Sequence, residues 1–190
     1  MMQLIHDVAP GADLAFQTAF NGQAGFANGI LDLANDAGAD VIVDDVIFFA
    51  EPMFQDGIIA QAVDTVVASG VSYFSSAGNA ARRSYESEFV NSNETLFVGA
   101  ENRGILHDFN SDEVAVDYMQ SITVPYLSGV IYTFQWDDPF FSVSGGSGSA
   151  SDLDFYIVDS VGTTVYAQSI TRNIGDDPVE VLQFTTLFHC

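Results

Sequence analysis

The chain has 190 residues, of which 26 are acidic and four are basic, so its formal net charge at pH 7 is −22. This charge repels nucleic acid and anionic membrane surfaces, and we expect neither as a partner. Because 48% of the residues are hydrophobic, the composition also excludes a disordered tail and suits one large domain or two small ones. The acidity is typical of a secreted or cation-binding protein, and equally of a protein with a solvated acidic surface.

The single cysteine and the two chain ends bear on processing and redox chemistry. Cys190 stands alone, so we expect no internal disulfide and no cysteine-rich metal site. The first residues, MMQLIHDVAPGADL, lack the basic region and apolar core of a signal peptide, and no apolar run is long enough for a membrane span. Because residues 3–5 have the pattern of the interior of a secondary-structure element and the last residues are apolar, we expect an internal fragment of a secreted parent protein.

Helical and strand patterns alternate in residues 1–90. Helices are predicted where apolar residues recur at helical spacing, and strands where short apolar runs lie between turn residues. In chain order, we predict a helix end at residues 1–5, a strand at 13–18, a helix at 25–37, a strand at 39–49, a helix at 58–68 and a strand at 71–74. This order predicts an α/β fold with a three-layer arrangement around a parallel sheet.

After about residue 83 the helical spacing disappears, and short alternating runs separated by Gly, Ser, Asn and Asp replace it. We predict strands at residues 93–99, 120–125, 130–136, 153–159, 163–169 and 179–185. The Gly- and Ser-rich run 142–152 is predicted to be a flexible loop. A series of short strands spaced by turns favours an all-β antiparallel sandwich domain, so we divide the chain into residues 1–104 and 105–190.

One stretch, ASGVSYFSSAGN at residues 68–79, marks a candidate site. Gly70 follows the predicted helix, where a residue that tolerates positive φ commonly ends a helix. The next run is a buried strand, and its last turn ends on Asn79. Open α/β sheets bind ligands at the carboxyl ends of their strands, so we expect Asn79 to lie in a site.

Three stretches of the first domain resemble the subtilisin-like serine proteases, the subtilase family. They are HDVAPGADL (6–14), ADVIVDDV (39–46) and AVDTVVASGVSYFSSAGN (62–79). The resemblance implies that residues 1–104 are part of a subtilisin-like peptidase core. It also implies that Asn79 is the oxyanion-hole asparagine, whose side-chain amide donates a hydrogen bond to the oxyanion that develops during acyl transfer.

The same resemblance implies a set of substrate-binding residues. The residues are Asp45, Val46, Ile47, Ser76, Ala77 and Gly78. The first three match the strand that pairs with the substrate backbone, and the last three match one wall of the pocket for the side chain before the scissile bond. The family usually has Ser-Leu-Gly in that strand, so an isoleucine in place of the glycine alters the expected pocket width.

The catalytic triad of the family is not found in the chain. No HGT or GTS motif, which would carry the histidine and the serine, occurs in the sequence. His6 lies in the segment that follows the family's histidine helix, so it is not the triad histidine. We therefore expect the central piece of a secreted serine endopeptidase with a polypeptide substrate. By itself it would be inactive, since the missing parts of its own catalytic domain would supply the triad.

The second half resembles the β-sandwich of the bacterial pre-peptidase C-terminal type, here inserted after the oxyanion turn and truncated at its end. The stretches that carry this resemblance are Trp136 to Pro139, SDLDFYIVD (151–159) and DDPVEVLQF (176–184). Trp136 and the adjacent Phe140 and Phe141 are expected in the sandwich core, with an aromatic binding patch as the alternative if the two phenylalanines are exposed.

A pair of aspartates in this half forms a candidate Ca²⁺ site. Asp152 and Asp154 alternate with Leu153, so both are expected on one face of a strand, where their repulsion favours a bound cation. Asp137, Asp138 and Glu180 are candidates to complete the ligand set. The alternative is an acidic strand end that faces solvent.

Two functions therefore stay open from the sequence. One is the serine endopeptidase fragment described above. The other is a non-catalytic, Ca²⁺-binding β-sandwich module that binds a protein or polysaccharide partner. In either case Asp44 and Asp45, as neighbours on a strand, are expected to face opposite sides, which disfavours a paired general acid and base.

Overall fold

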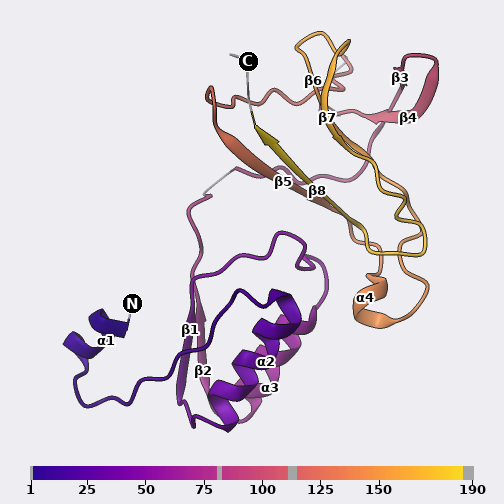
Figure 1. The fold of residues 1–190 in the computed structure, drawn as a ribbon. Coiled ribbons are helices and arrows are strands. Elements are labelled where there is room, and N and C mark those ends of the chain that lie inside the picture. The colour runs from indigo at the N-terminus through magenta and orange to yellow at the C-terminus, as the bar shows by residue number, and fades with distance from the viewer. Residues whose placement is uncertain (1, 81–82, 111–114, 186–190) are drawn as a thin grey trace.

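The computed structural model describes residues 2–80, 83–110 and 115–185. Its helices and strands are mixed along the chain (Figure 1). The helices are α1 (Met2–Val8), α2 (Gly22–Asn35), α3 (Ile58–Ala68) and α4 (Phe141–Ser144). The strands are β1 (Val41–Asp44), β2 (Ser72–Ser75), β3 (Asn91–Val98), β4 (Glu101–His107), β5 (Gly129–Gln135), β6 (Phe155–Val158), β7 (Val165–Ser169) and β8 (Val179–Thr185).

The first half is built around the parallel pair β1 and β2, which α3 connects. Their register runs from Val41 opposite Ser72 to Asp44 opposite Ser75. Helices α2 and α3 lie side by side against one face of this pair (Figure 1). The buried side chains shared by these elements are Ala27, Ile30, Ile42, Ile59, Ala62 and Val66. This small cluster is the core of the α/β part, and it fixes where the two strands end.

Helix α3 has the bounds that the apolar spacing predicted, and it ends as expected at Gly70. The backbone φ of Gly70 is +102°, a value that side chains with a Cβ rarely adopt. The N–H of Gly70 donates to the carbonyl of Val67, and the N–H of Val71 donates to that of Val66. These bonds satisfy the last carbonyls of the helix and turn the chain directly into β2.

The expected three-layer arrangement is wrong for the described residues, because the helices cover one face of the β1–β2 pair only. On the other face Val41, Val43 and Phe74 are exposed. The predicted strand at 13–18 is an extended segment without a ladder partner. The predicted strand at 39–49 is shorter than expected, because β2 ends opposite Asp44 and offers no partner backbone beyond that point.

The second half contains three antiparallel pairs, β3 with β4, β5 with β8, and β6 with β7. Five predicted strands are confirmed, β8 with the predicted bounds and the other four with shifted bounds, whereas residues 120–125 form none. Strand β4 and the short helix α4 were not predicted, and α4 occupies the start of the run expected to be a flexible loop. The expected domain boundary after residue 104 falls inside β4. Since each sheet has two strands, the sandwich stays a prediction.

Strand β5 has two chemically different faces, as its period of two requires. Phe134 lies 5.4 Å from Trp136 and 6.3 Å from Phe155 of β6, measured between ring centroids. Tyr132 is 5.7 Å from the same Phe155 ring. Trp136 and Phe140 are buried whereas Phe141 is exposed, so an aromatic patch formed by both phenylalanines is excluded.

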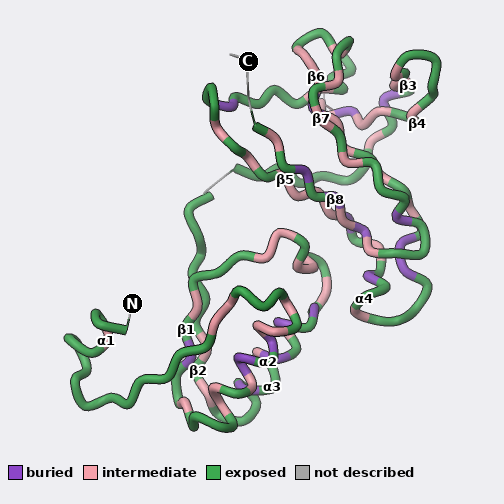
Figure 2. Tube along the Cα trace, viewed as in Figure 1, coloured by how far each residue is buried: buried purple, intermediate pink, exposed green. Residues whose placement is uncertain are grey.

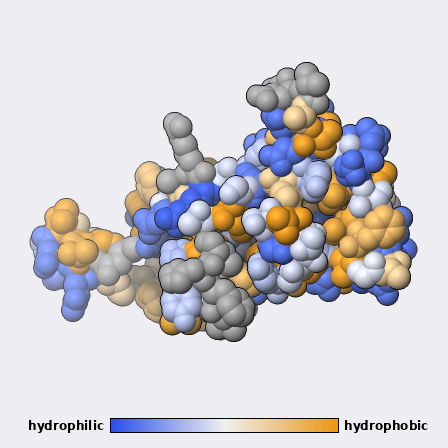
Figure 3. Space-filling view, turned by 90° about the horizontal axis from the view of Figure 1, so that it is seen from above, coloured by the Kyte–Doolittle hydropathy of each residue, from blue (hydrophilic) through white to orange (hydrophobic). Residues whose placement is uncertain are grey.

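Burial is concentrated in the α2–α3 layer and, in the second half, in β8 and the loops that flank β5 and β8 (Figure 2). The surface seen from above carries apolar and polar patches side by side (Figure 3). Among the described residues, no helix is long and apolar enough to cross a membrane.

The core of the α/β part can be tested with two neighbouring isoleucines of α3. Ile59 is 6% exposed and packs in the core, whereas Ile58 is 38% exposed. We expect Ile59→Ala to lower the free energy of unfolding by about 2–5 kcal/mol, because it removes buried methyl groups and leaves a cavity. The matched control Ile58→Ala should cost less than about 1 kcal/mol. Urea denaturation followed by circular dichroism measures both, and equal costs would contradict this core.

Candidate functional site

The carboxyl ends of β1 and β2 form the candidate site. The two strands are parallel, so their ends meet at the same edge of the sheet. Asp45 follows β1 directly, and Ser76 follows β2. The last ladder pair, Asp44 and Ser75, lies at this edge, and the chain after β2 continues through Gly78 to Asn79.

Asp44 is the best-bonded side chain of the site. Its carboxylate accepts hydrogen bonds from the Tyr73 hydroxyl at 2.5 Å and from the Ser75 hydroxyl at 2.9 Å. Both donors come from β2 and alternate along it, so they share the face on which Asp44 lies. Burial raises the pKa of Tyr73 far above its usual 10.0, and the hydrogen bond to Asp44 and the charge of Asp44 raise it further.

Asp45 faces a different partner, as the alternation along a strand predicted. It is exposed, and its carboxylate accepts a hydrogen bond of 2.7 Å from the Ser76 hydroxyl. The expectation that neighbouring aspartates do not converge on one atom is therefore consistent with the geometry. Each aspartate ties the end of β1 to the end of β2.

Asn79 lies beyond this network and is exposed. Gly78, with a φ of +71°, precedes it and turns the chain out of the sheet. Within the part of the chain that the structure describes, no hydrogen bond occupies the Asn79 side-chain amide. Its two N–H donors are therefore open to a ligand at the strand ends, whereas Ser75 and Ser76 are used internally.

Glu51 comes from the loop after β1 and completes the acidic side of the site. It is half-buried, and burial together with the charge of Asp44 raises its pKa. Its charge also contributes to the raised pKa of Tyr73. Glu51, Asp44 and Tyr73 therefore lie close enough to influence one another.

The remaining substrate-binding residues expected from the sequence lie at the same edge. Asp45, Val46 and Ile47 are exposed and lie beyond the last ladder pair of β1. The segment of Ser76, Ala77 and Gly78 is exposed and lies beyond the last pair of β2. The structure thus brings the expected residues of both strands together. The arrangement offers amide donors and open backbone, and it lacks a histidine base.

A serine and a histidine do lie close together elsewhere, the serine in the segment before β3 and the histidine at the end of β4. His107 Nε2 is 3.2 Å from the Ser87 hydroxyl and 3.2 Å from the Tyr85 hydroxyl. The Val90 N–H donates to His107 Nδ1 at 3.0 Å, so the neutral ring carries its proton on Nε2. A protonated Nε2 cannot accept the serine proton, which excludes this pair as nucleophile and base. Burial lowers the pKa of His107 and favours this neutral form.

Of the candidate calcium ligands, Glu180 is the most buried, at 2% exposure. Its carboxylate accepts hydrogen bonds from the Ser169 hydroxyl and from the Thr171 N–H. Burial raises the pKa of Glu180, and the charges of Asp154 and Asp152 raise it further. Asp152 and Asp154 lie just before β6 and outside it, so their expected placement on one face of a strand stays a prediction.

The other two candidate ligands differ in their surroundings. Asp138 accepts hydrogen bonds from the Ser149 hydroxyl and from the N–H groups of Ala150 and Ser151. Burial alone would raise the pKa of Asp138, but these bonds outweigh it and hold the pKa below its usual range. Asp137 is exposed. Asp138 therefore fixes a loop of its own chain.

Asp152 and Asp154 also have internal donors. The Asn173 N–H donates to Asp152 at 2.9 Å, and the Tyr156 hydroxyl donates to Asp154 at 2.9 Å. Among residues 2–80, 83–110 and 115–185, no group of three or more His, Cys, Asp or Glu side chains is arranged to hold a metal ion. The calcium site stays a prediction.

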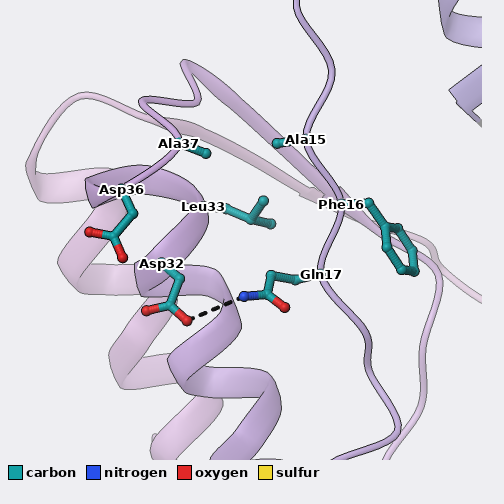
Figure 4. Close-up of a pocket in the computed structure, with 7 residues that line it drawn as sticks. All are labelled: Ala15, Phe16, Gln17, Asp32, Leu33, Asp36 and Ala37. Carbon is teal, nitrogen blue, oxygen red and sulfur yellow. Dashed lines mark hydrogen bonds between the residues drawn. The ribbon is translucent and has the colours of Figure 1, made fainter.

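A shallow hollow of about 310 Å³ lies between the extended segment 15–17 and the second half of α2 (Figure 4). Gln17 donates a hydrogen bond to Asp32 across it at 3.3 Å, and Leu33 forms its apolar wall. It contains no histidine, serine or cysteine, so it provides no nucleophile. We place the candidate site at the strand ends instead.

Comparison of the chain with protein-family models, with curated proteins and with solved structures finds no match in any of the three. The arrangement of the site is therefore interpreted from its own geometry.

The hydrogen bond between Tyr73 and Asp44 can be tested by removing one hydroxyl. We expect Tyr73→Phe to lower the free energy of unfolding at pH 7 by about 1–2 kcal/mol, because Asp44 loses a donor. The raised pKa of Tyr73 means that the unfolded chain releases this proton first, so stability should be retained below about pH 10 and fall as the pH rises above it.

Denaturation curves at pH 7 to 11 measure this effect. In Tyr73→Phe the alkaline fall should be smaller. The matched control is Tyr166→Phe, since Tyr166 is 42% exposed and its hydroxyl has no hydrogen bond within the described chain. An unchanged alkaline fall in Tyr73→Phe would contradict the assignment.

The calcium hypothesis has its own test in thermal unfolding. If Asp152, Asp154 and Glu180 hold Ca²⁺, millimolar Ca²⁺ should raise the Tm of the chain, because a ligand of the folded state stabilises it by mass action. Asp154→Asn should remove this rise, whereas Asp64→Asn on α3, an exposed aspartate of the other half, should retain it. A Tm that does not respond to Ca²⁺ would rule out the site.

Proposed function

We propose that residues 1–104 belong to the catalytic domain of a subtilisin-like serine endopeptidase that acts on polypeptides outside the cell. In this proposal Asn79 donates a hydrogen bond to the oxyanion. The observation that carries the proposal is the exposed side-chain amide of Asn79, which follows β2 beyond the edge where β1 also ends and has no hydrogen bond within the described residues.

In the proposal, each element of the site has a role in acyl transfer. Asp45 to Ile47 lie beyond the ladder, and apart from the Val46 N–H, which donates to the Asp44 carboxylate at 3.4 Å, their backbone groups are available to pair with an extended substrate. Ser76 to Gly78 continue β2 and form one side of the pocket for the side chain before the scissile bond. The bonds of Asp44 and Asp45 to β2 hold these two segments in fixed relation.

The reaction also needs a nucleophile and a base that this site does not contain. A serine hydroxyl must attack the carbonyl while a histidine, oriented by an aspartate, takes its proton. Ser75 and Ser76 donate to carboxylates, and the pair of Ser87 and His107 has the wrong tautomer. In the proposal, the triad comes from parts of the parent protein outside residues 1–190, and this chain supplies the oxyanion donor and substrate contacts.

The role of Asn79 predicts a selective kinetic loss in the parent endopeptidase. Asn79→Ala should lower kcat about 10²–10³-fold with a small change in KM, since the amide acts on the transition state more than on the bound substrate. The control is Asn35→Ala, at the exposed end of α2, which should leave both constants unchanged. Peptide hydrolysis at saturating and limiting substrate separates the two constants.

A serine-reactive fluorophosphonate probe adds a second readout. It should label the parent protein and its Asn79→Ala variant, because the nucleophile is intact in both, and it should not label residues 1–190 alone. Labelling of the isolated chain, or an Asn79→Ala variant with wild-type kcat, would overturn the proposal.

A further inference from the structure

The two halves of the chain are joined by side chains of β5. Thr133 and Gln135 alternate with Phe134, whose ring contacts Phe155 and Trp136. Because successive side chains of a strand point to opposite faces, Thr133 and Gln135 point away from this aromatic contact. Both reach instead to the loop that follows β1, more than 80 residues earlier in the chain.

The contacts are made to backbone groups of that loop. The Thr133 hydroxyl donates to the Phe49 carbonyl at 2.7 Å. The Gln135 amide makes two bonds, one from Nε2 to the Glu51 carbonyl at 2.8 Å and one to Oε1 from the Met53 N–H at 3.0 Å. The Gln135 side chain thus bonds both a carbonyl and an N–H of the loop, as the backbone of a neighbouring strand would. Two such bonds restrain the backbone conformation of the loop as well as its position.

This loop leads out of the candidate site. It begins where the exposed segment Asp45 to Ile47 ends, and it carries Glu51, which influences the pKa of Tyr73 beside Asp44. A further bond, from the Phe140 N–H to the Gln55 side chain at 3.4 Å, lies just before α3. The β part therefore contacts the connection between β1 and α3 at four places, from Phe49 to Gln55.

We propose that Thr133 and Gln135 are positioning residues, which hold the loop Phe49 to Met53 and thereby fix the substrate-pairing segment Asp45 to Ile47. The second half of the chain then controls how well the site binds a polypeptide. This inference rests on the proposed function and deepens it, because it names the device through which the β part regulates that same site.

The first test concerns the loop itself and needs no catalysis. In Gln135→Leu, a variant of similar size without hydrogen-bonding groups, amide hydrogen exchange of the segment around Met53 should become about tenfold faster, as expected for the loss of a net hydrogen bond. Gln183→Leu is the matched control, because Gln183 is exposed on β8, the strand paired with β5. Its exchange near Met53 should be that of the wild type.

The second test concerns substrate binding in the parent endopeptidase. Gln135→Leu and Thr133→Val should raise KM for a peptide several-fold with little change in kcat, since they loosen a binding segment and leave the oxyanion donor in place. Gln135→Asn, which keeps the amide on a shorter side chain, should recover part of the loss. A merely structural role would lower the active fraction and hence kcat, without this split.

The outcomes separate this inference from the proposed function. Unchanged exchange near Met53 in Gln135→Leu, or a loss in kcat alone, overturns the positioning role while Asn79→Ala still tests the oxyanion donor. Conversely, wild-type kcat in Asn79→Ala overturns the proposed function even where the loop of Gln135→Leu exchanges faster.

Discussion

The parallel register of β1 and β2 is the constraint on which the candidate site depends. The two strands are only four residues each, too short to be stable alone, and the packing of α2 and α3 on one face holds them together. Helix α3 sets the distance between them along the chain, and Gly70 turns the chain into β2 without a long loop. Asp44 meets Ser75 because of this register, and every polar contact of the site follows from it.

The sequence predicted the positions of helices and strands better than it predicted which strands pair with one another. The bounds of α3 follow from its apolar spacing and from Gly70, both of which are local signals. Residues 13–18 have an equally apolar pattern but form no ladder, because a strand requires a neighbour and the pattern does not contain one. The same reason shortens β1. The pairing of β5 with β8, which are about 50 residues apart in the chain, likewise cannot be predicted from the hydrophobic periodicity of either strand.

The candidate site was predicted only in part, because its polar contacts also depend on which strands pair. The position of Asn79 after a predicted strand indicated the edge of the sheet at which we place the candidate site, although the strand was expected to be buried and β2 has no buried residue. The bonds from Tyr73 and Ser75 to Asp44 were not predicted, because they depend on the register between two strands. Glu51 and Gln135 were missed as well, since each acts through a contact between distant segments and neither belongs to a motif.

The kind of donor that bonds the carboxylates of this acidic chain determines how its stability responds to salt. The bonded carboxylates of Asp44, Asp138, Asp159 and Glu180 accept from hydroxyl and backbone N–H groups, which are neutral. Among the described residues, the single ion pair is that of Arg103 with Glu101. Dissolved salt weakens attraction between opposite charges but has little effect on neutral donors, while it also screens the repulsion among the many surface carboxylates. On this argument, rising ionic strength should stabilise the described part of the chain, because it screens repulsion between surface carboxylates and weakens a single described ion pair.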